Sequence, residues 1–203
     1  MLYQVSFQLE TQDILGVFGS NGSGKSTLLK LLFGVLKADT LQLQLDGKPL
    51  LASEVIKKKY IAYLPQHSFL PKFSKVRDII PIYHTSEEKQ DALFYNEGIA
   101  KITHKRIGEL SHGECKYFET ILLGNLDHPF MLLDEPFSML EPLQTEALKT
   151  FLLQLKNTKG LLITDHYYQD VLDITTHNRV LKDGQSHAIA GIEDLKKFES
   201  LRK

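Results

Sequence analysis

A glycine-rich stretch, GSNGSGKST at residues 19–27, constrains this chain more than any other part of its sequence. It follows the apolar run 14–18 and leads into the leucine-rich segment 28–32. That order predicts a strand, a loop and a helix, the context in which the pattern G-x-x-x-x-G-K-S binds phosphate. A glycine loop that only connects a strand to a helix would not need every fixed position of this pattern. The chain is therefore predicted to bind a nucleoside triphosphate.

Each residue type in this loop suits a contact with phosphate. The three glycines permit backbone conformations that a Cβ obstructs, so that successive N–H groups can point toward phosphate oxygens. The helix that begins near Lys25 adds its positive end, and the Lys25 ammonium can reach the β- and γ-phosphates. The next hydroxyl, on Ser26, can ligate Mg²⁺. The predicted nucleotide-binding residues are Gly19, Ser20, Asn21, Gly22, Ser23, Gly24, Lys25, Ser26 and Thr27.

The composition excludes several other classes of protein. The chain has 203 residues, of which 42% are hydrophobic and 24% charged, as in an ordinary soluble globular protein. A formal net charge of −1 disfavours binding to nucleic acid through a basic surface. The single cysteine, Cys115, excludes an internal disulfide and suits a reducing cytoplasm. Because no apolar stretch is long enough to span a bilayer and no signal peptide precedes the first strand-like segment, we expect any membrane role to come through a partner.

Hydrophobic runs that alternate with helical patterns predict an α/β fold with a mostly parallel sheet. Strands are predicted at 2–9, 14–18, 41–45, 60–64, 130–133 and 161–164, with a closing hairpin across 179–190. Helices are predicted at 26–33, 114–124 and 143–155. Residues 67–110 show helical stretches without a strong strand pattern, which predicts an inserted helical subdomain. We expect one domain, with a core lobe of 1–66 and 127–203 and a helical subdomain of about 67–126.

Polar residues follow four of the predicted strands, and in such sheets ligands bind at the carboxyl ends of the strands. They are the loop at 19–27, Gln66, Asp134-Glu135 and Asp165-His166. Asp134 is placed to hold Mg²⁺ and Glu135 to orient or deprotonate an attacking water. Alternatively, the two acids only precede a helix N-terminus. His166 could donate to the γ-phosphate, whereas Gln66 alone also fits ordinary loop chemistry.

Taken in order, these motifs resemble those of the ATP-binding cassette (ABC) ATPases over nearly the whole chain. The matching segments are the Walker A loop GSNGSGKST (19–27), the Q-loop YLPQ (63–66), a signature-like LSHGE (110–114), the Walker B segment FMLLDEP (130–136), a D-loop-like SMLEP (138–142) and the switch segment ITDH (163–166). A P-loop kinase or GTPase would share only the first of these.

The resemblance implies a P-loop NTPase fold of the ABC-ATPase type, with N-terminal antiparallel strands, that hydrolyses ATP to ADP and phosphate. It assigns catalysis to Glu135, His166, Lys25 and Gln66, and Mg²⁺ binding to Ser26, Gln66 and Asp134. The signature residues Ser111, His112, Gly113 and Glu114 would close on the γ-phosphate held by a second cassette. Independently, Ser111 followed by Glu114 fits a capping box at the start of a helix.

Four positions depart from the family pattern. His112 replaces the usual third-position glycine of the signature, and Glu114 replaces a glutamine. Glu141 stands where the D-loop often has an aspartate. The family also stacks an aromatic side chain on adenine from an upstream strand, and Tyr3 is the candidate here.

The leading hypothesis is the ATP-hydrolysing subunit of an ABC transporter, which dimerises around ATP and drives separate transmembrane subunits from the cytoplasmic face of the membrane. The second is a soluble ABC protein of DNA repair or translation, and the third is a regulatory cassette with weak turnover. A narrower likeness, carried by LLDEPF, ITDH and 172–174, is to bacterial lipopolysaccharide-export and branched-chain amino acid ATPases. The sequence does not indicate the transported substrate.

Overall fold

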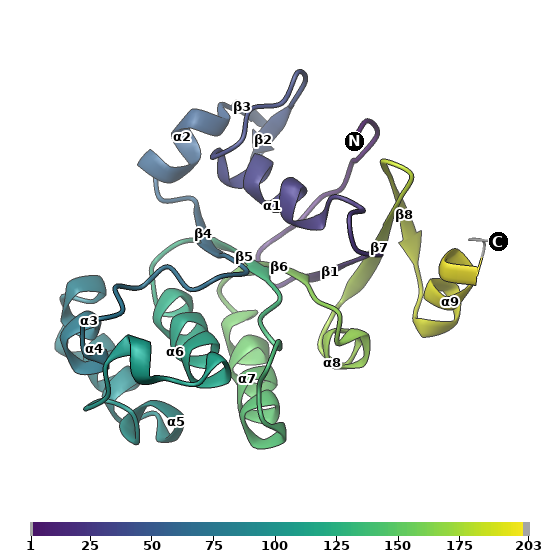
Figure 1. Ribbon diagram of the computed structural model, residues 1–203. Coiled ribbons are helices and arrows are strands. Elements are labelled where there is room, and N and C mark those ends of the chain that lie inside the picture. The colour runs from purple at the N-terminus through teal and green to yellow at the C-terminus, as the bar shows by residue number, and fades with distance from the viewer. Residues whose placement is uncertain (1, 201–203) are drawn as a thin grey trace.

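A twisted six-stranded sheet lies at the centre of residues 2–200, the part of the chain that the computed structural model describes (Figure 1). Its order is β4 (Ile61–Leu64), β5 (Phe130–Asp134), β6 (Gly160–Thr164), β1 (Ile14–Phe18), β7 (His177–Lys182) and β8 (Gln185–Ile189). The first five strands are parallel and β8 is antiparallel to β7. The predicted mostly parallel sheet is therefore confirmed.

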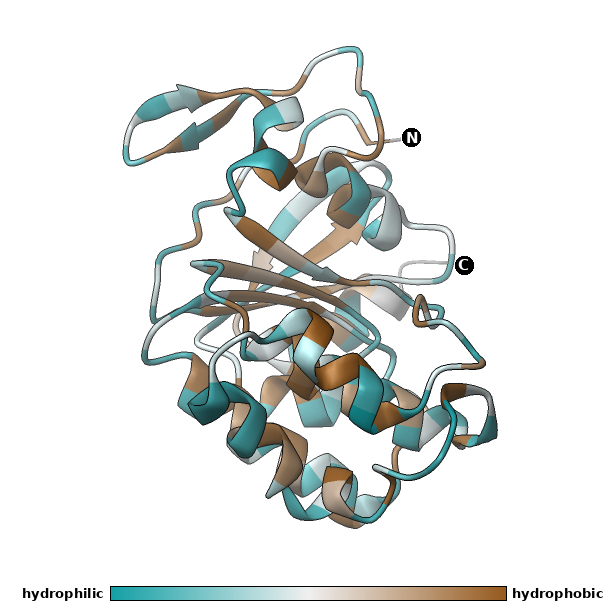
Figure 2. Ribbon diagram, turned by 90° about the vertical axis from the view of Figure 1, so that its left-hand side faces the viewer, coloured by the Kyte–Doolittle hydropathy of each residue, from teal (hydrophilic) through white to brown (hydrophobic). Residues whose placement is uncertain are grey.

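Helices cover both faces of this sheet, which is why its central strands are continuous apolar runs. Every residue of β1 and β6 is buried. On one face lie α1 (Lys25–Phe33) and α2 (Ala52–Lys57), and on the other α6 (His112–Gly124), α7 (Pro142–Leu155) and α8 (Tyr168–Leu172) (Figure 1). In Figure 2 the strands run between these two layers of helices. The sheet thus holds the carboxyl ends of its parallel strands at one edge.

Two hairpins turn at Asp-Gly dipeptides. The first joins β2 (Leu43–Leu45) to β3 (Lys48–Leu50) as a separate two-stranded sheet that projects beyond α1 (Figure 2). Its turn residues, Asp46 and Gly47, both have positive φ, at 50° and 72°, as a tight two-residue hairpin requires. The second hairpin joins β7 to β8 through Asp183 and Gly184, which also have positive φ.

Short helices occupy the segment that the sequence assigns to a helical subdomain. They are α3 (Val76–Tyr83), α4 (Glu87–Phe94), α5 (Glu97–Ala100) and the 3₁₀ turn η1 (Ile107–Glu109), gathered beside α6 (Figure 1). The helical character predicted for 67–110 is confirmed. A further helix, α9 (Ile192–Ser200), is not among the predicted elements. None of the helices within residues 2–200 has the length and apolar content that crossing a bilayer requires.

The predicted strand at 2–9 is wrong. Only Gln4 forms a bridge, with Gln185, and the rest of the segment is irregular. Its backbone partners explain this: the Ser6 N–H and carbonyl both bond to the hydroxyl of Ser186 rather than to the backbone of β8. The apolar residues of the alternation still pack on the core that includes Leu15 and Leu29. The alternating pattern therefore predicted the half-buried side chains correctly, but it predicted a strand pairing that the segment does not form.

Candidate active site

The glycine-rich loop connects β1 to α1 and is built from left-handed backbone conformations. Gly19, Gly22 and Gly24 have φ of 149°, 78° and 102°. At Gly19 a Cβ would also lie 2.7 Å from the carbonyl oxygen of Leu181, so a side chain would have no room there. Gly24 then caps α1, whose first residue is Lys25. The loop therefore has the conformation that turns backbone N–H groups toward an anion at a helix N-terminus.

The Lys25 side chain folds back onto this loop. Its Nζ donates to the carbonyl oxygens of Gly19, at 2.6 Å, and Ser20, at 3.3 Å. Only 7% of the residue is exposed, and burial lowers its pKa, although Glu135 and Asp134 act in the opposite direction. The ammonium thus lies inside the loop, close to the two carboxylates at the end of β5.

Asp134 is the point at which the glycine-rich loop meets the strand ends. Its Oδ1 accepts hydrogen bonds from the hydroxyls of Ser26, at 3.1 Å, and Thr164, at 2.9 Å. Its Oδ2 accepts one from the phenol of Tyr63, at 3.4 Å, whose pKa is raised by burial and by the Asp134 charge. Ser26 and Asp134, both predicted to hold Mg²⁺, are therefore in direct contact. Tyr63 and Thr164 were predicted only as members of the segments YLPQ and ITDH, without a contact to Asp134, and both lie at strand ends next to β5.

Glu135 and His166 face each other across the ends of β5 and β6. Glu135 Oε1 lies 3.0 Å from His166 Nε2. Glu135 has a left-handed φ of 56°, and its N–H donates to the carbonyl of Thr164 at 2.7 Å. This turn ends β5, and residues 135–139 form turns rather than a helix. The alternative that the two acids only precede a helix N-terminus is therefore wrong.

Asp165, which the sequence analysis placed at a strand end without a role, joins two loops of the site. Its Oδ1 accepts from the N–H groups of His166, at 2.7 Å, and Tyr167, at 3.0 Å. Its Oδ2 accepts from the N–H of Phe137, at 2.8 Å. Burial raises the pKa of this carboxyl to about 6, against the effect of the three N–H donors. The loop after β5 and the loop after β6 are thus held by one side chain.

Gln66 follows β4, the strand next to β5. Leu64 pairs with Leu133, so Gln66 leaves the sheet beside Asp134, and the residue is exposed. The loop that it begins is hydrogen bonded to Lys116 and Glu119 of α6. Neither residue was predicted from the sequence, where the available signal was a pair of charges within the mostly apolar part of this helix.

The signature-like segment opens α6. Ser111 Oγ accepts from the Glu114 N–H at 3.0 Å, and Glu114 Oε2 accepts from the Ser111 N–H at 2.9 Å, so the predicted capping box is confirmed. Glu114 also pairs with Lys105 at 2.8 Å. His112 is exposed, whereas Gly113 is buried against the D-loop-like segment. A Cβ on Gly113 would lie 2.3 Å from the carbonyl oxygen of Met139.

A sequence model described as ABC transporter matches residues 2–138 of the chain. The chain belongs to the ABC transporter family. It is 27% identical to the lipopolysaccharide export system ATP-binding protein LptB of Haemophilus influenzae, over 98% of this chain and 88% of that protein. It is 26% identical to the thiamine import ATP-binding protein ThiQ of Vibrio parahaemolyticus, over 96% of this chain and 87% of that protein.

Solved structures support the same fold for this ABC cassette. The structure of an ATP-binding subunit of an ABC transporter superposes with a TM-score of 0.83 at 21% identity, covering 99% of this chain and 88% of the other. A nucleotide-free cassette from an ABC transporter gives a TM-score of 0.80 at 24% identity, over 98% of this chain and 88% of the other. The cassette is thus a P-loop NTPase, an ATP-binding subunit of the kind that hydrolyses ATP to power transport.

Three of the cassette's four departures from the family pattern lie on its surface. Tyr3, the candidate for stacking on adenine, is 65% exposed, and its hydroxyl accepts from Gln185 at 2.8 Å. Glu141 and His112 are exposed as well. The fourth, Glu114, is half-buried and paired with Lys105.

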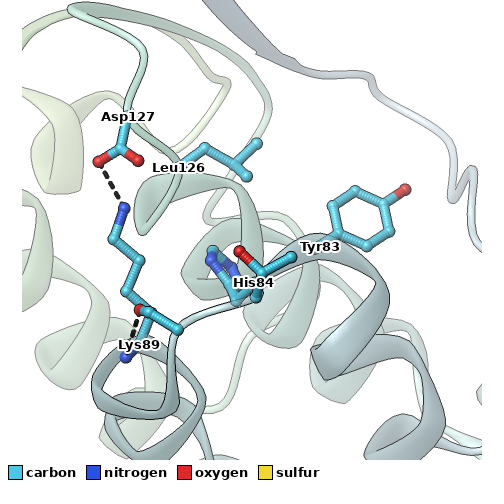
Figure 3. A pocket seen from close by; sticks show the side chains of 7 residues that line it. Tyr83, His84, Lys89, Leu126 and Asp127 are labelled. Carbon is cyan, nitrogen blue, oxygen red and sulfur yellow. Dashed lines mark hydrogen bonds and ion pairs between the residues drawn. The ribbon is translucent and has the colours of Figure 1, made fainter.

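A hollow of about 180 Å³ lies in the helical part of the cassette (Figure 3). It is lined by Tyr83, His84, Thr85, Ser86, Lys89, Leu126 and Asp127. Its two charged groups, Lys89 and Asp127, pair with each other. The imidazole of His84 is bonded through Nε2 to the carbonyl of Leu122 at 2.9 Å. These groups already have partners within the protein, and the glycine-rich loop remains the better candidate for the active site.

Proposed function

We propose that this cassette binds ATP with Mg²⁺ at residues 19–27, hydrolyses it in a dimer of cassettes and drives separate transmembrane permease subunits. The observation that carries the proposal is the 3.1 Å hydrogen bond between Ser26 and Asp134. It joins the phosphate-binding loop to the strand end from which the candidate base, Glu135, also projects. The catalytic residues in this proposal are Lys25, Gln66, Glu135 and His166.

The residues at this point fit Mg²⁺. The Ser26 hydroxyl and the Asp134 carboxylate supply hard oxygen ligands, and Gln66 leaves the neighbouring strand beside them. No group of three or more His, Cys, Asp or Glu side chains able to hold a metal occurs among the described residues 2–200. That suits an ion held partly by substrate phosphates and water. When bound, Mg²⁺ neutralises charge on the β- and γ-phosphates.

The chain's own residues then have separate tasks. Lys25 exchanges the carbonyl of Gly19 for phosphate oxygens. Glu135 accepts a proton from the water that attacks the γ-phosphorus, while the bond from that phosphorus to the ADP oxygen breaks. His166 orients Glu135, from which it lies 3.0 Å away, and donates to the γ-phosphate. Phosphoryl transfer needs mainly such positioning and charge neutralisation.

A second cassette, identical or different, completes the site in this proposal. The signature residues Ser111–Glu114 form the N-terminus of a 13-residue helix, and Ser111 and His112 are exposed. Such a terminus attracts the γ-phosphate held by the partner cassette. We also propose that 1–66 and 127–203 act as the core lobe and about 67–126 as the helical subdomain. Cytoplasmic attachment to the membrane would come through the permease, and the net charge of −1 argues against nucleic acid as a partner.

The test is nucleotide-dependent dimerisation, measured by analytical ultracentrifugation with and without Mg²⁺ and ATP. Glu135→Gln should bind ATP, stop turning over and accumulate as a dimer, while the wild type turns over and dissociates. Glu146→Gln, which changes an exposed glutamate on α7, is the matched control. A wild type that binds ATP but neither dimerises nor hydrolyses it, and that gains both in His112→Gly, would instead be a degenerate regulatory cassette. An active dimer that never co-purifies with a membrane subunit would favour a soluble ABC protein.

A further inference from the structure

Lys116 on α6 is bonded to the beginning of the loop that carries Gln66. Its Nζ donates to the carbonyl oxygens of Pro65, at 2.9 Å, and Gln66, at 2.8 Å. Only 7% of the residue is exposed. The lysine therefore fixes the backbone of Gln66, and the side chain of Gln66 remains available to a ligand.

Glu119, nearly one helical turn further along α6, is bonded to the next part of the same loop. Its Oε1 accepts from the Ser68 hydroxyl at 2.6 Å and from the Phe69 N–H at 3.2 Å. The residue is fully buried, and its Oε2 has no hydrogen-bond partner. Together with Lys116, it forms what we call the loop clamp, defined as these two side chains on α6.

The loop clamp places two charged side chains in the interior, and their desolvation destabilises a helix that only packs against the core. Burying a charge is costly unless it is paired and hydrogen bonded, and one oxygen of Glu119 is not bonded. The neighbours of these residues on α6, Phe118 and Ile121, are apolar and fully or almost fully buried. Apolar residues at these two positions would suffice for packing. The two charges therefore indicate that residues 65–69 must be held in one position.

We propose that Lys116 and Glu119 are positioning residues that make the loop of Gln66 move together with the signature segment. Both belong to the helix that Ser111 begins, less than three turns from its N-terminus. A helix moves as a rigid rod, so a displacement of Ser111 on contact with a second cassette also displaces the backbone of Gln66. This inference rests on the proposed function, in which Ser111 contacts the γ-phosphate and Gln66 contacts Mg²⁺. It assigns to α6 the mechanical link between these two contacts.

The first experiment compares two lysines with the same chemistry at different places. Lys159, like Lys116, is buried and donates to two backbone carbonyls, those of Leu126 and His128. In hydrogen exchange of the full chain without nucleotide, Lys116→Met should speed exchange of peptides covering 65–70 by about tenfold, as expected for a lost buried hydrogen bond. Lys159→Met should leave those peptides unchanged.

The second experiment separates positioning from general structure. Lys116→Met should lower kcat about tenfold while the Kd for ATP stays within about twofold, because residues 19–27 are untouched. Lys116→Arg should recover most of kcat. Ser68→Ala, at an exposed residue, removes one donor to Glu119 and the acceptor of the Cys115 thiol, so it serves if Lys116→Met does not fold.

The proposal is overturned if folded Lys116→Met, or Ser68→Ala in its place, leaves both the exchange of 65–70 and kcat at wild-type values. An equal loss of kcat in Lys159→Met would also overturn it, because the effect would then be general. The exchange experiment needs neither dimer nor ATP. A cassette that fails to dimerise would therefore defeat the proposed function and leave the exchange result standing.

Discussion

The carboxylate of Glu135 and the imidazole of His166 are 3.0 Å apart, joined between Oε1 and Nε2. The two side chains follow the ends of adjacent strands, β5 and β6, and the backbone N–H of each is held by a hydrogen bond. Glu135 is anchored by its N–H to Thr164, and His166 by its N–H to Asp165. The proposed base is therefore oriented by the residue proposed to contact the γ-phosphate.

This pairing predicts that the two side chains act as a unit. Glu135→Gln should lower kcat by about 10² to 10⁴, the usual cost of losing a general base, and His166→Ala should lower it by a similar order. The double variant should lose little more than the worse single one, because each group works through the other. Steady-state ATP hydrolysis measures this, with His104→Ala as an exposed control. Losses that multiply in the double variant would show that the two residues act independently.

Lys25 and Lys30 lie on the same helix and provide a matched pair for nucleotide affinity. Lys25 is buried in the loop, whereas Lys30 is exposed near the other end of α1. Lys25→Met should weaken ATP binding by about 10- to 150-fold, the loss expected for hydrogen bonds to a charged group. Lys30→Met should change the Kd less than twofold. Binding is measured by titration with a fluorescent ATP analogue, and equal effects of the two variants would refute the assignment.

Gly113 and His112 should respond differently to substitution. Alanine at Gly113 would place Cβ 2.3 Å from the Met139 carbonyl, which must then move. We expect Gly113→Ala to lower the free energy of unfolding by about 1 kcal/mol, since crowding of about 1 to 3 kcal/mol exceeds the gain in helix propensity. His112→Ala, at an exposed position, should stay within about 0.5 kcal/mol. Urea denaturation distinguishes them, and a stabilised Gly113→Ala would contradict the close contact.

His84 should make stability depend on pH. Burial lowers the pKa of this imidazole below its ordinary value of 6.5, so the folded protein keeps it neutral where the unfolded chain takes up a proton. The stabilising contribution is therefore complete above pH 6.5 and is lost as the pH falls below it, at up to about 1.4 kcal/mol per pH unit. In His84→Gln, which can still donate to Leu122, this loss should be absent. Denaturation at pH 5.5 and 7.5 compares the two proteins, and equal slopes would exclude His84 as the cause.

Most of the fold follows from local patterns in the sequence. The apolar runs at β1, β5 and β6 predict central strands because only a sheet covered on both faces accommodates them. The turns at 46–47 and 183–184 follow from residues that tolerate positive φ. Residues 2–9 were mispredicted because alternation reports which side chains are buried, whereas strand pairing depends on a partner backbone 180 residues away.

Only those residues of the site that belong to a motif of fixed spacing were predictable from the sequence. Lys25, Ser26, Asp134 and Glu135 stand at fixed spacings that carry their own chemistry. Lys116 and Glu119 belong to none of these motifs. Thr164 and Asp165 lie within ITDH, but their roles do not follow from it, because their partners are brought together by tertiary packing. The roles assigned to the motif residues remain predictions for the experiments above.

The three N–H groups that bond to Asp165 have a consequence for how this region opens. Phe137, His166 and Tyr167 share one acceptor side chain, so none of the three can leave it without altering the charge distribution felt by the other two. Fluctuations of the two loops should therefore be cooperative, with a single opening free energy in place of three independent ones. On release of phosphate, the loop after β5 and the loop after β6 would then change conformation together, in one step.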